Sequence, residues 1–323
     1  MRVFTQFILF LTALSLVSCA SLPVAENTEQ WLYAAGDTNG TVLERYAPVF
    51  VVSDPGQEYN RIGRAEVRYE GGVERVFVDP GQSSVYTQIL PWASALHEYR
   101  NLVYRVHFSE VPYSIAPFHL GAGKNPGLLV ILTIDETDAP VILTTVHTCG
   151  CYLAILPFSR LSEDSYPQQW DIIEQQVYGI TLPGLLKQLR PDLGEKLFVE
   201  LKPGTHRIVS VGILNLQSVK ERHLETMEIV PMGDLDNLQS VQGAVSFFET
   251  EGTRRGYVKD SYKPFERLLM SWWALDWHVG EDKAYGPQEE TGVRFYTSLK
   301  FWRREESDMW NFERFLHFWG WNL

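Results

Sequence analysis

The chain has 323 residues, of which 45% are hydrophobic and 21% are charged, and its formal net charge is −12 at pH 7. This composition is typical of a globular protein and argues against a largely disordered chain. The excess of negative charge repels phosphates, and no basic stripe offsets it. Nucleic acid is therefore not expected as a partner, and neither is electrostatic attraction to anionic lipid.

The first residues have the features of a bacterial lipoprotein signal peptide. A mostly apolar run over residues 3–17 is short for a membrane span but suits the hydrophobic region of a signal peptide. The run ends in Leu16-Val17-Ser18-Cys19, which resembles a lipobox. The resemblance implies that residues 1–18 are removed and that the thiol of Cys19 receives a lipid. An ordinary secretory signal that happens to contain a cysteine is the alternative.

The lipobox resemblance also implies a location. Ala20 follows Cys19, and in lipoproteins of bacteria with two membranes a residue other than Asp at this position usually directs release to the outer membrane. Residues 19–30 then form a short lipidated tether, and two acyl chains give a stable anchor. We therefore expect a protein of the outer membrane that faces the periplasm and is attached to the membrane through its lipid anchor.

Residues 31–323 are expected to form a single large α+β domain with a mostly antiparallel β-sheet core. The clearest hairpin joins residues 65–70 to residues 73–78 through Gly71-Gly72, because two glycines supply the positive φ angles of a tight turn. Helices are predicted near residues 170–177 and over residues 182–190. Further strands are predicted over residues 85–89, 102–108, 197–201, 206–216, 223–230 and 244–249.

A second hairpin joins two almost entirely apolar runs, residues 128–134 and 141–146. Strands of this composition are expected to be covered on both faces. A turn centred near residues 137–138 pairs His147 with Leu128 in a simple antiparallel ladder.

The segment 262–323 is rich in aromatic residues and predicted to be helical, since seven of the ten tryptophans lie between Trp272 and Trp321. Each of its two predicted helices carries an apolar stripe, and both stripes are expected to pack on the sheet as core. The alternative is an interfacial belt on a membrane or an aromatic platform for a glycan or apolar ligand. The first stripe comprises Phe265, Leu268, Leu269, Trp272 and Trp273, and the second comprises Phe312, Phe315, Leu316 and Trp319.

The second hairpin runs into His147, Cys149 and Cys151, which share one face of an extended strand. With Cys19 lipidated in an oxidising compartment, Cys149 and Cys151 are a candidate disulfide. The same residues are also candidate ligands for Zn or Cu, with His119 as a fourth ligand if the glycine-rich loop 121–127 redirects it.

A third interpretation of this cluster is a cysteine nucleophile. Thr148-Cys149-Gly150-Cys151 loosely resembles the Ser-x-Gly-Cys element of L,D-transpeptidases, whose cysteine attacks a peptide of the cell wall. Tyr152 departs from that pattern. The sequence therefore predicts a binding or structural component of the cell envelope, and the alternative is a metal- or thiol-dependent envelope enzyme centred on His147, Cys149 and Cys151.

Overall fold

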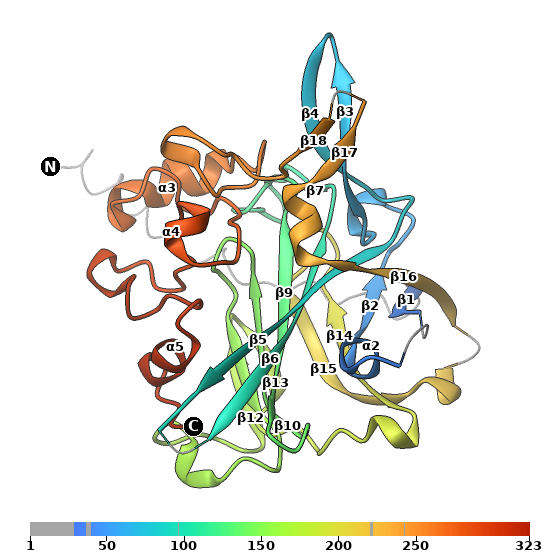
Figure 1. Ribbon diagram of the computed structural model, residues 1–323, viewed down its shortest axis with the longest axis vertical. Coiled ribbons are helices and arrows are strands. Elements are labelled where there is room, and N and C mark those ends of the chain that lie inside the picture. The colour runs from blue at the N-terminus through green and yellow to red at the C-terminus, as the bar shows by residue number, and fades with distance from the viewer. Residues whose placement is uncertain (1–28, 37–39, 96, 220–221, 242) are drawn as a thin grey trace, which may run out of the picture.

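The computed structural model describes residues 29–36, 40–95, 97–219, 222–241 and 243–323 (Figure 1). The lipobox, the Cys19 attachment point and nearly all of the predicted tether lie outside the described residues. Within these ranges, no helix is both long and apolar enough to cross a membrane.

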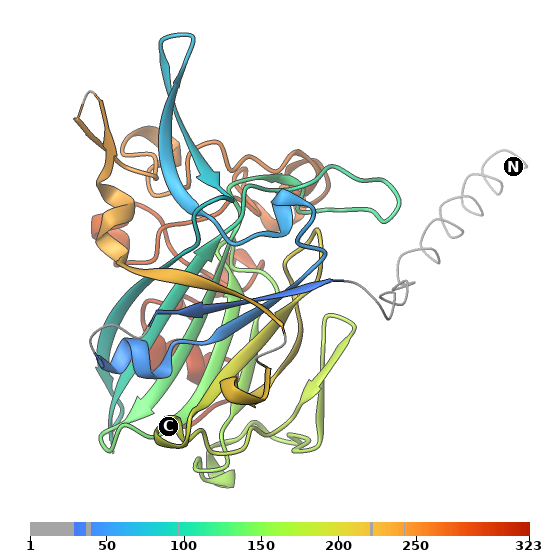
Figure 2. The same cartoon turned by 90° about the vertical axis from the view of Figure 1, so that its right-hand side faces the viewer.

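A curled ten-stranded sheet forms the centre of the molecule (Figure 1). In Figure 2, β1 and β2 cross the view at a steep angle to β9 and β10, because neighbouring strands are rotated relative to one another by the twist of the sheet. In spatial order the strands are β11 (Ala154–Pro157), β10 (Pro140–His147), β9 (Gly127–Asp135), β6 (Glu98–His107), β5 (Ser84–Ala93), β16 (His223–Pro231), β1 (Gln30–Ala35), β2 (Val49–Ser53), β14 (Glu195–Leu201) and β15 (Ile208–Asn215).

The sheet is mixed, which corrects the expectation of a mostly antiparallel core. Parallel pairing joins β5 to β16, β16 to β1 and β2 to β14. The prediction assumed that strands without a helix between them pair antiparallel with their neighbours in sequence. In the structure the parallel partners are far apart in the chain. β1, for example, pairs with residues 223–227 of β16. Because many other elements lie between the two strands in the chain, they can be parallel without a single helix that connects them.

The apolar hairpin of β9 and β10 is confirmed, and so is its register, which pairs His147 with Leu128. Alternate residues of β9 enter two different cores, because successive side chains of a strand point to opposite faces. Val130 and Leu132 pack in the larger core on one face of the sheet. Leu129 and Ile131 pack in the second core, together with the C-terminal helix.

Four two-stranded sheets accompany the main sheet. The predicted hairpin of β3 (Arg64–Glu70) and β4 (Val73–Asp79) is confirmed, with positive φ at Gly71 and Gly72. The helices predicted at 170–177 and 182–190 are wrong. β12 (Glu174–Val177) and β13 (Ile180–Pro183) pair around Tyr178 and Gly179, both at positive φ, and residues 184–190 are not helical. The other two-stranded sheets are formed by β7 (Glu110–Val111) with β8 (Gly123–Lys124) and by β17 (Leu238–Ser240) with β18 (Gly243–Val245).

The described α-helices are short, and two of them carry the stripes predicted from sequence. In α5 three of the four stripe residues, Phe312, Phe315 and Leu316, are buried in the second core, as expected, whereas Trp319 is exposed. In α3 the stripe faces outward, so the expectation that it forms core is wrong. The helices are α2 (Val42–Tyr46), α3 (Pro264–Ala274), α4 (Gln288–Thr291) and α5 (Phe312–Phe318), with 3₁₀ turns η1 (Glu58–Asn60), η2 (Glu163–Ser165), η3 (Pro191–Leu193), η4 (Leu216–Val219), η5 (Met232–Asp236), η6 (Gly252–Arg254) and η7 (Phe301–Arg303).

Candidate functional site

The His147, Cys149 and Cys151 cluster lies in the tight loop that leads from β10 to β11. The backbone N–H of His147 donates to the carbonyl of Cys151 at 2.9 Å, and the N–H of Gly150 donates to the carbonyl of His147 at 2.7 Å. Gly150 has a φ of 90°, and a Cβ at this position would lie 2.1 Å from the backbone oxygen of Tyr296. Only glycine therefore fits at the centre of this loop.

Cys149 and Cys151 form a disulfide, and their Cα atoms are 5.6 Å apart. In an extended strand this separation would be about 6.6 Å. The turn at Gly150 shortens it from near the upper limit for a disulfide to the most common separation, about 5.5–6 Å. Cys149 is buried and Cys151 is half-buried, so the bond lies just beneath the surface.

His147 completes the cluster. One of its ring nitrogens and the two sulfur atoms all lie within 4.8 Å of one another. His119, the fourth ligand proposed from sequence, is outside this group, and its Nδ1 instead lies 2.9 Å from the carbonyl of Pro112. The structure thus brings three of the four candidate ligands together. In the disulfide form the two sulfurs are bonded to each other and are not thiolate ligands.

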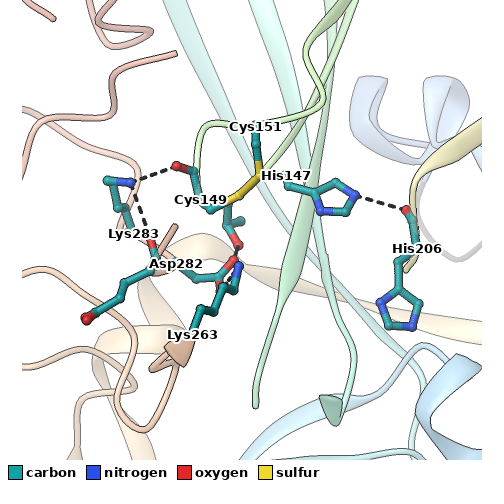
Figure 3. The surroundings of a disulfide bond; sticks show 9 residues. His147, Cys149, Cys151, His206, Lys263, Asp282 and Lys283 are labelled. Carbon is teal, nitrogen blue, oxygen red and sulfur yellow. Dashed lines mark hydrogen bonds and ion pairs between the residues drawn. A yellow bond between two sulfur atoms is a disulfide. The ribbon is translucent and has the colours of Figure 1, made fainter. Parts of the chain in front are cut away.

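Burial determines the protonation state of His147. Its Nε2 lies 3.2 Å from the backbone oxygen of His206 and donates to it (Figure 3). Burial lowers the pKa of His147 to about 3, and the charge of Lys263 acts in the same direction. His147 is therefore neutral near pH 7, with Nδ1 free of a proton, as a metal ligand or a general base requires.

A buried charged network supports the other side of the disulfide loop (Figure 3). The Nζ atom of Lys283 donates to the backbone oxygens of Cys149 at 2.7 Å and of Glu281 at 3.2 Å. Asp282 accepts a hydrogen bond of 2.5 Å from the hydroxyl of Thr148 and forms an ion pair of 2.9 Å with Lys263. The loop is therefore fixed by side chains from a segment more than 100 residues later in the chain.

The charges of this network depend on their pairing. Burial acts to lower the pKa of Lys263, but the carboxylates of Asp282 and Glu266 outweigh it and raise the pKa. Burial raises the pKa of Glu266 and lowers the pKa of Lys283 to about 8. Sequence reasoning did not select these four residues as one group, since adjacent charged residues are usually solvated and nothing local marks them as buried.

A second candidate site is the surface formed by Leu268, Leu269, Trp272, Trp273, Leu275 and Trp277, which we call the α3 surface. Leu268 is 74% exposed and Trp272 is 71% exposed, and the other four are also exposed. The inward face of α3 instead carries Glu266, Ser271 and Ala274. Because the polar network beneath the helix includes Glu266, the polar side of α3 faces the protein and the apolar side faces out.

Neighbouring groups extend the α3 surface. Phe265 packs against Tyr113 and Phe118 of the loop between β7 and β8, with ring centroids 5.8 and 5.2 Å apart. Both of these loop residues are exposed. The guanidinium of Arg267 lies 4.1 Å from the centre of the Trp277 ring, which is a cation–π contact. Aromatic rings of the β7–β8 loop therefore adjoin α3 at Phe265, and Arg267 places a cation beside Trp277.

Comparisons of the chain with family models, with curated proteins and with solved structures found no match.

Proposed function

We propose that this protein is a lipoprotein of the bacterial outer membrane that faces the periplasm, lies on the bilayer through the α3 surface, and serves as a binding or structural component of the envelope. The observation that carries the proposal is the outward-facing stripe of α3. A soluble domain normally covers such a stripe, and a large exposed apolar patch marks an interaction site.

The chemistry of the α3 surface matches a membrane interface. Tryptophan combines an apolar ring with an N–H donor, and it concentrates where hydrocarbon meets water. Leu268 and Leu269 provide apolar groups that can enter the acyl region. With a net charge of −12 on the whole chain, attachment would depend on apolar burial rather than on attraction to anionic lipid.

The length of the tether also supports contact between the α3 surface and the membrane. If Cys19 carries the lipid, the first described residue, Glu29, follows it by ten positions in the chain. An extended chain spans at most about 3.6 Å per residue, so Glu29, where the domain begins, lies within about 36 Å of the bilayer. The effective concentration of membrane near the α3 surface is then high, and a weak apolar contact is sufficient for docking.

Two measurements test the two parts of this proposal separately. Mass spectrometry of the native protein should find an amino terminus at a diacylglyceryl-modified Cys19, and an unmodified thiol there would contradict the anchor. The full-length protein should then be placed in vesicles that contain brominated phosphatidylcholine, which quenches nearby tryptophans. We expect quenching that is lost in the triple variant Trp272→Phe, Trp273→Phe, Trp277→Phe and retained in Trp31→Phe. Anchored protein without quenching would indicate that a protein partner, not lipid, covers the α3 surface.

A second candidate function is a metal- or thiol-dependent enzyme, and the proximity of His147, Cys149 and Cys151 favours it. Reduction of the disulfide would provide two thiolates beside a neutral imidazole, a set that suits Zn or Cu. Metal analysis of protein purified without a tag under reducing conditions tests this function. We expect bound metal in the wild type and its loss in Cys149→Ser, while His317→Gln, at an exposed histidine, keeps it. Wild-type protein free of metal, with slow labelling of its thiols, would remove this candidate.

A further inference from the structure

A buried arginine without a complete set of partners lies in β6. Arg105 is 0% exposed, and its Nε donates to Nε2 of His107 at 2.8 Å. Its guanidinium packs over the ring of Phe248 at 5.2 Å. Nη1 and Nη2 have no hydrogen-bond partner among the described residues. Leaving charged donors buried and unpaired is costly, so this arrangement requires an explanation.

A cavity of about 420 Å³ adjoins this arginine, and Arg105 and Gln88 both form part of its wall. Gln88 on β5 pairs with Val103, and Arg105 pairs with Tyr86, so the Gln88 and Arg105 side chains lie diagonally on one face of the sheet. The Nε2 atom of Gln88 is likewise buried without a partner among the described residues. Three nitrogen atoms, which together carry six N–H groups, are therefore gathered beside one cavity without a hydrogen-bond partner among the described residues.

The rest of the cavity wall has a different character. Asp236, at the end of η5, Glu249 and Glu290, in α4, carry carboxylates, and Arg255 carries a second guanidinium. Phe248, Tyr285 and Trp310 contribute aromatic rings. The wall thus carries three carboxylates and two guanidinium groups. A simple anion would meet repulsion from the carboxylates, whereas a ligand that carries both a negative and a positive charge can pair with both kinds of group.

We propose that this cavity binds a small zwitterion of the amino-acid type. The ligand carboxylate would accept paired hydrogen bonds from Nη1 and Nη2 of Arg105, the geometry in which guanidinium and carboxylate match best. Its ammonium group would face Asp236 and Glu290, and its side chain would lie against the aromatic wall. The cavity shares no residue with the α3 surface, so this inference does not depend on anchoring to a membrane.

Isothermal titration of the full-length protein with phenylalanine and alanine, each as the D and the L isomer, tests the proposal. We expect at least one of the four to bind. For that amino acid, the analogue without the amino group and the amide without the carboxylate should each bind at least tenfold more weakly. Arg105→Met should abolish binding. Asp236→Asn should weaken binding of the amino acid but not binding of the analogue that lacks the amino group. Asp234→Asn, at an exposed neighbour outside this cavity, should change neither affinity.

Failure of all four amino acids to bind the wild type would overturn the proposal, as would equal affinity for the amide. If Arg105→Met does not fold, the affinities of Gln88→Leu and Asp236→Asn for the bound amino acid test the proposal instead. Unchanged affinity in both of these variants would place the bound amino acid elsewhere on the protein and would also overturn the proposal.

Discussion

The Nζ atom of Lys283 donates a hydrogen bond of 2.7 Å to the backbone carbonyl of Cys149, so a lysine from the last quarter of the chain fixes the disulfide loop at the end of β10. Both residues are buried. The contact joins the sheet to the aromatic-rich C-terminal part of the chain, and the stability of the loop is thereby linked to the protonation of one amine.

This link predicts a pH dependence. Burial lowers the pKa of Lys283 from 10.5 to about 8. Between these values the unfolded chain holds a proton that the folded protein has lost, so the free energy of unfolding increases as the pH rises through this interval. We expect the wild type to gain up to about 1.4 kcal/mol per pH unit relative to Lys283→Met. Urea denaturation at pH 8, 9 and 10 measures this gain. Lys300→Met, at an exposed lysine, should show the same pH dependence of the free energy of unfolding as the wild type. Parallel curves for wild type and Lys283→Met would contradict the assignment.

The ion pair of Lys263 with Asp282 predicts a large effect of a single substitution. Both side chains are buried, and Lys263→Met would leave the carboxylate of Asp282 without its cation. Breaking a buried pair in this way costs about 3–5 kcal/mol of stability. The control is Lys259→Met, because Lys259 pairs with Glu74 at 3.7 Å near the surface, where a loss of about 1 kcal/mol or less is expected. Denaturant melts of the two variants should differ clearly, and similar losses would show that the pairing of Lys263 is not important.

Gly150→Ala should be much more damaging than a glycine substitution at an open turn. At Gly72 the φ angle is 81° and no atom lies near an added Cβ, so Gly72→Ala should cost about 1–2 kcal/mol from backbone conformation alone. At Gly150 the added Cβ would also collide with the Tyr296 carbonyl, which brings the expected loss to about 3 kcal/mol or more. Thermal unfolding of both variants under non-reducing conditions gives the comparison. Equal losses would mean that the contact with Tyr296 is looser than described.

The opposite orientations of α3 and α5 predict opposite responses to alanine. Phe315 is fully buried in the second core, and Phe315→Ala should cost about 3–5 kcal/mol. Trp272→Ala removes a larger ring, yet because Trp272 is exposed we expect the free energy of unfolding in detergent solution to change by no more than about 0.5 kcal/mol. The measurement is chemical denaturation of each variant beside the wild type. A severe loss for Trp272→Ala would indicate that α3 packs its apolar side inward.

The parts of this fold that could be predicted from sequence are those with local causes. The hairpin of β9 and β10, its register at His147, and the hairpin closed by Gly71-Gly72 follow from apolar runs and turn residues that are close in the chain. The helix α5 and its buried stripe follow from helical spacing. The helices wrongly predicted near residues 170–190 show the limit, because the turn at Tyr178 and Gly179 favours a hairpin over a weak helical pattern.

The remaining features depend on contacts between distant segments. The sequence indicates that α3 has an apolar stripe, but its direction depends on Glu266 belonging to a buried polar network. Likewise, the loop around Cys149 is visible in the sequence, whereas its support by Lys283 is not. Arg105 sits within an ordinary strand pattern, and only the arrangement of β5 beside β6 reveals that its outer nitrogens lack partners.

The central position of β1 has a mechanical consequence. β1 is hydrogen-bonded to β2 on one side and to β16 on the other, so the chain enters the domain in the middle of the sheet and not at its edge. A pull on residue 29 along the strand would load both ladders in shear at once, and their bonds would have to break together rather than peel apart one by one. A domain pulled from this point would therefore resist unfolding by force. The centre of its sheet can form only after the ribosome has synthesised β16, which ends at Pro231.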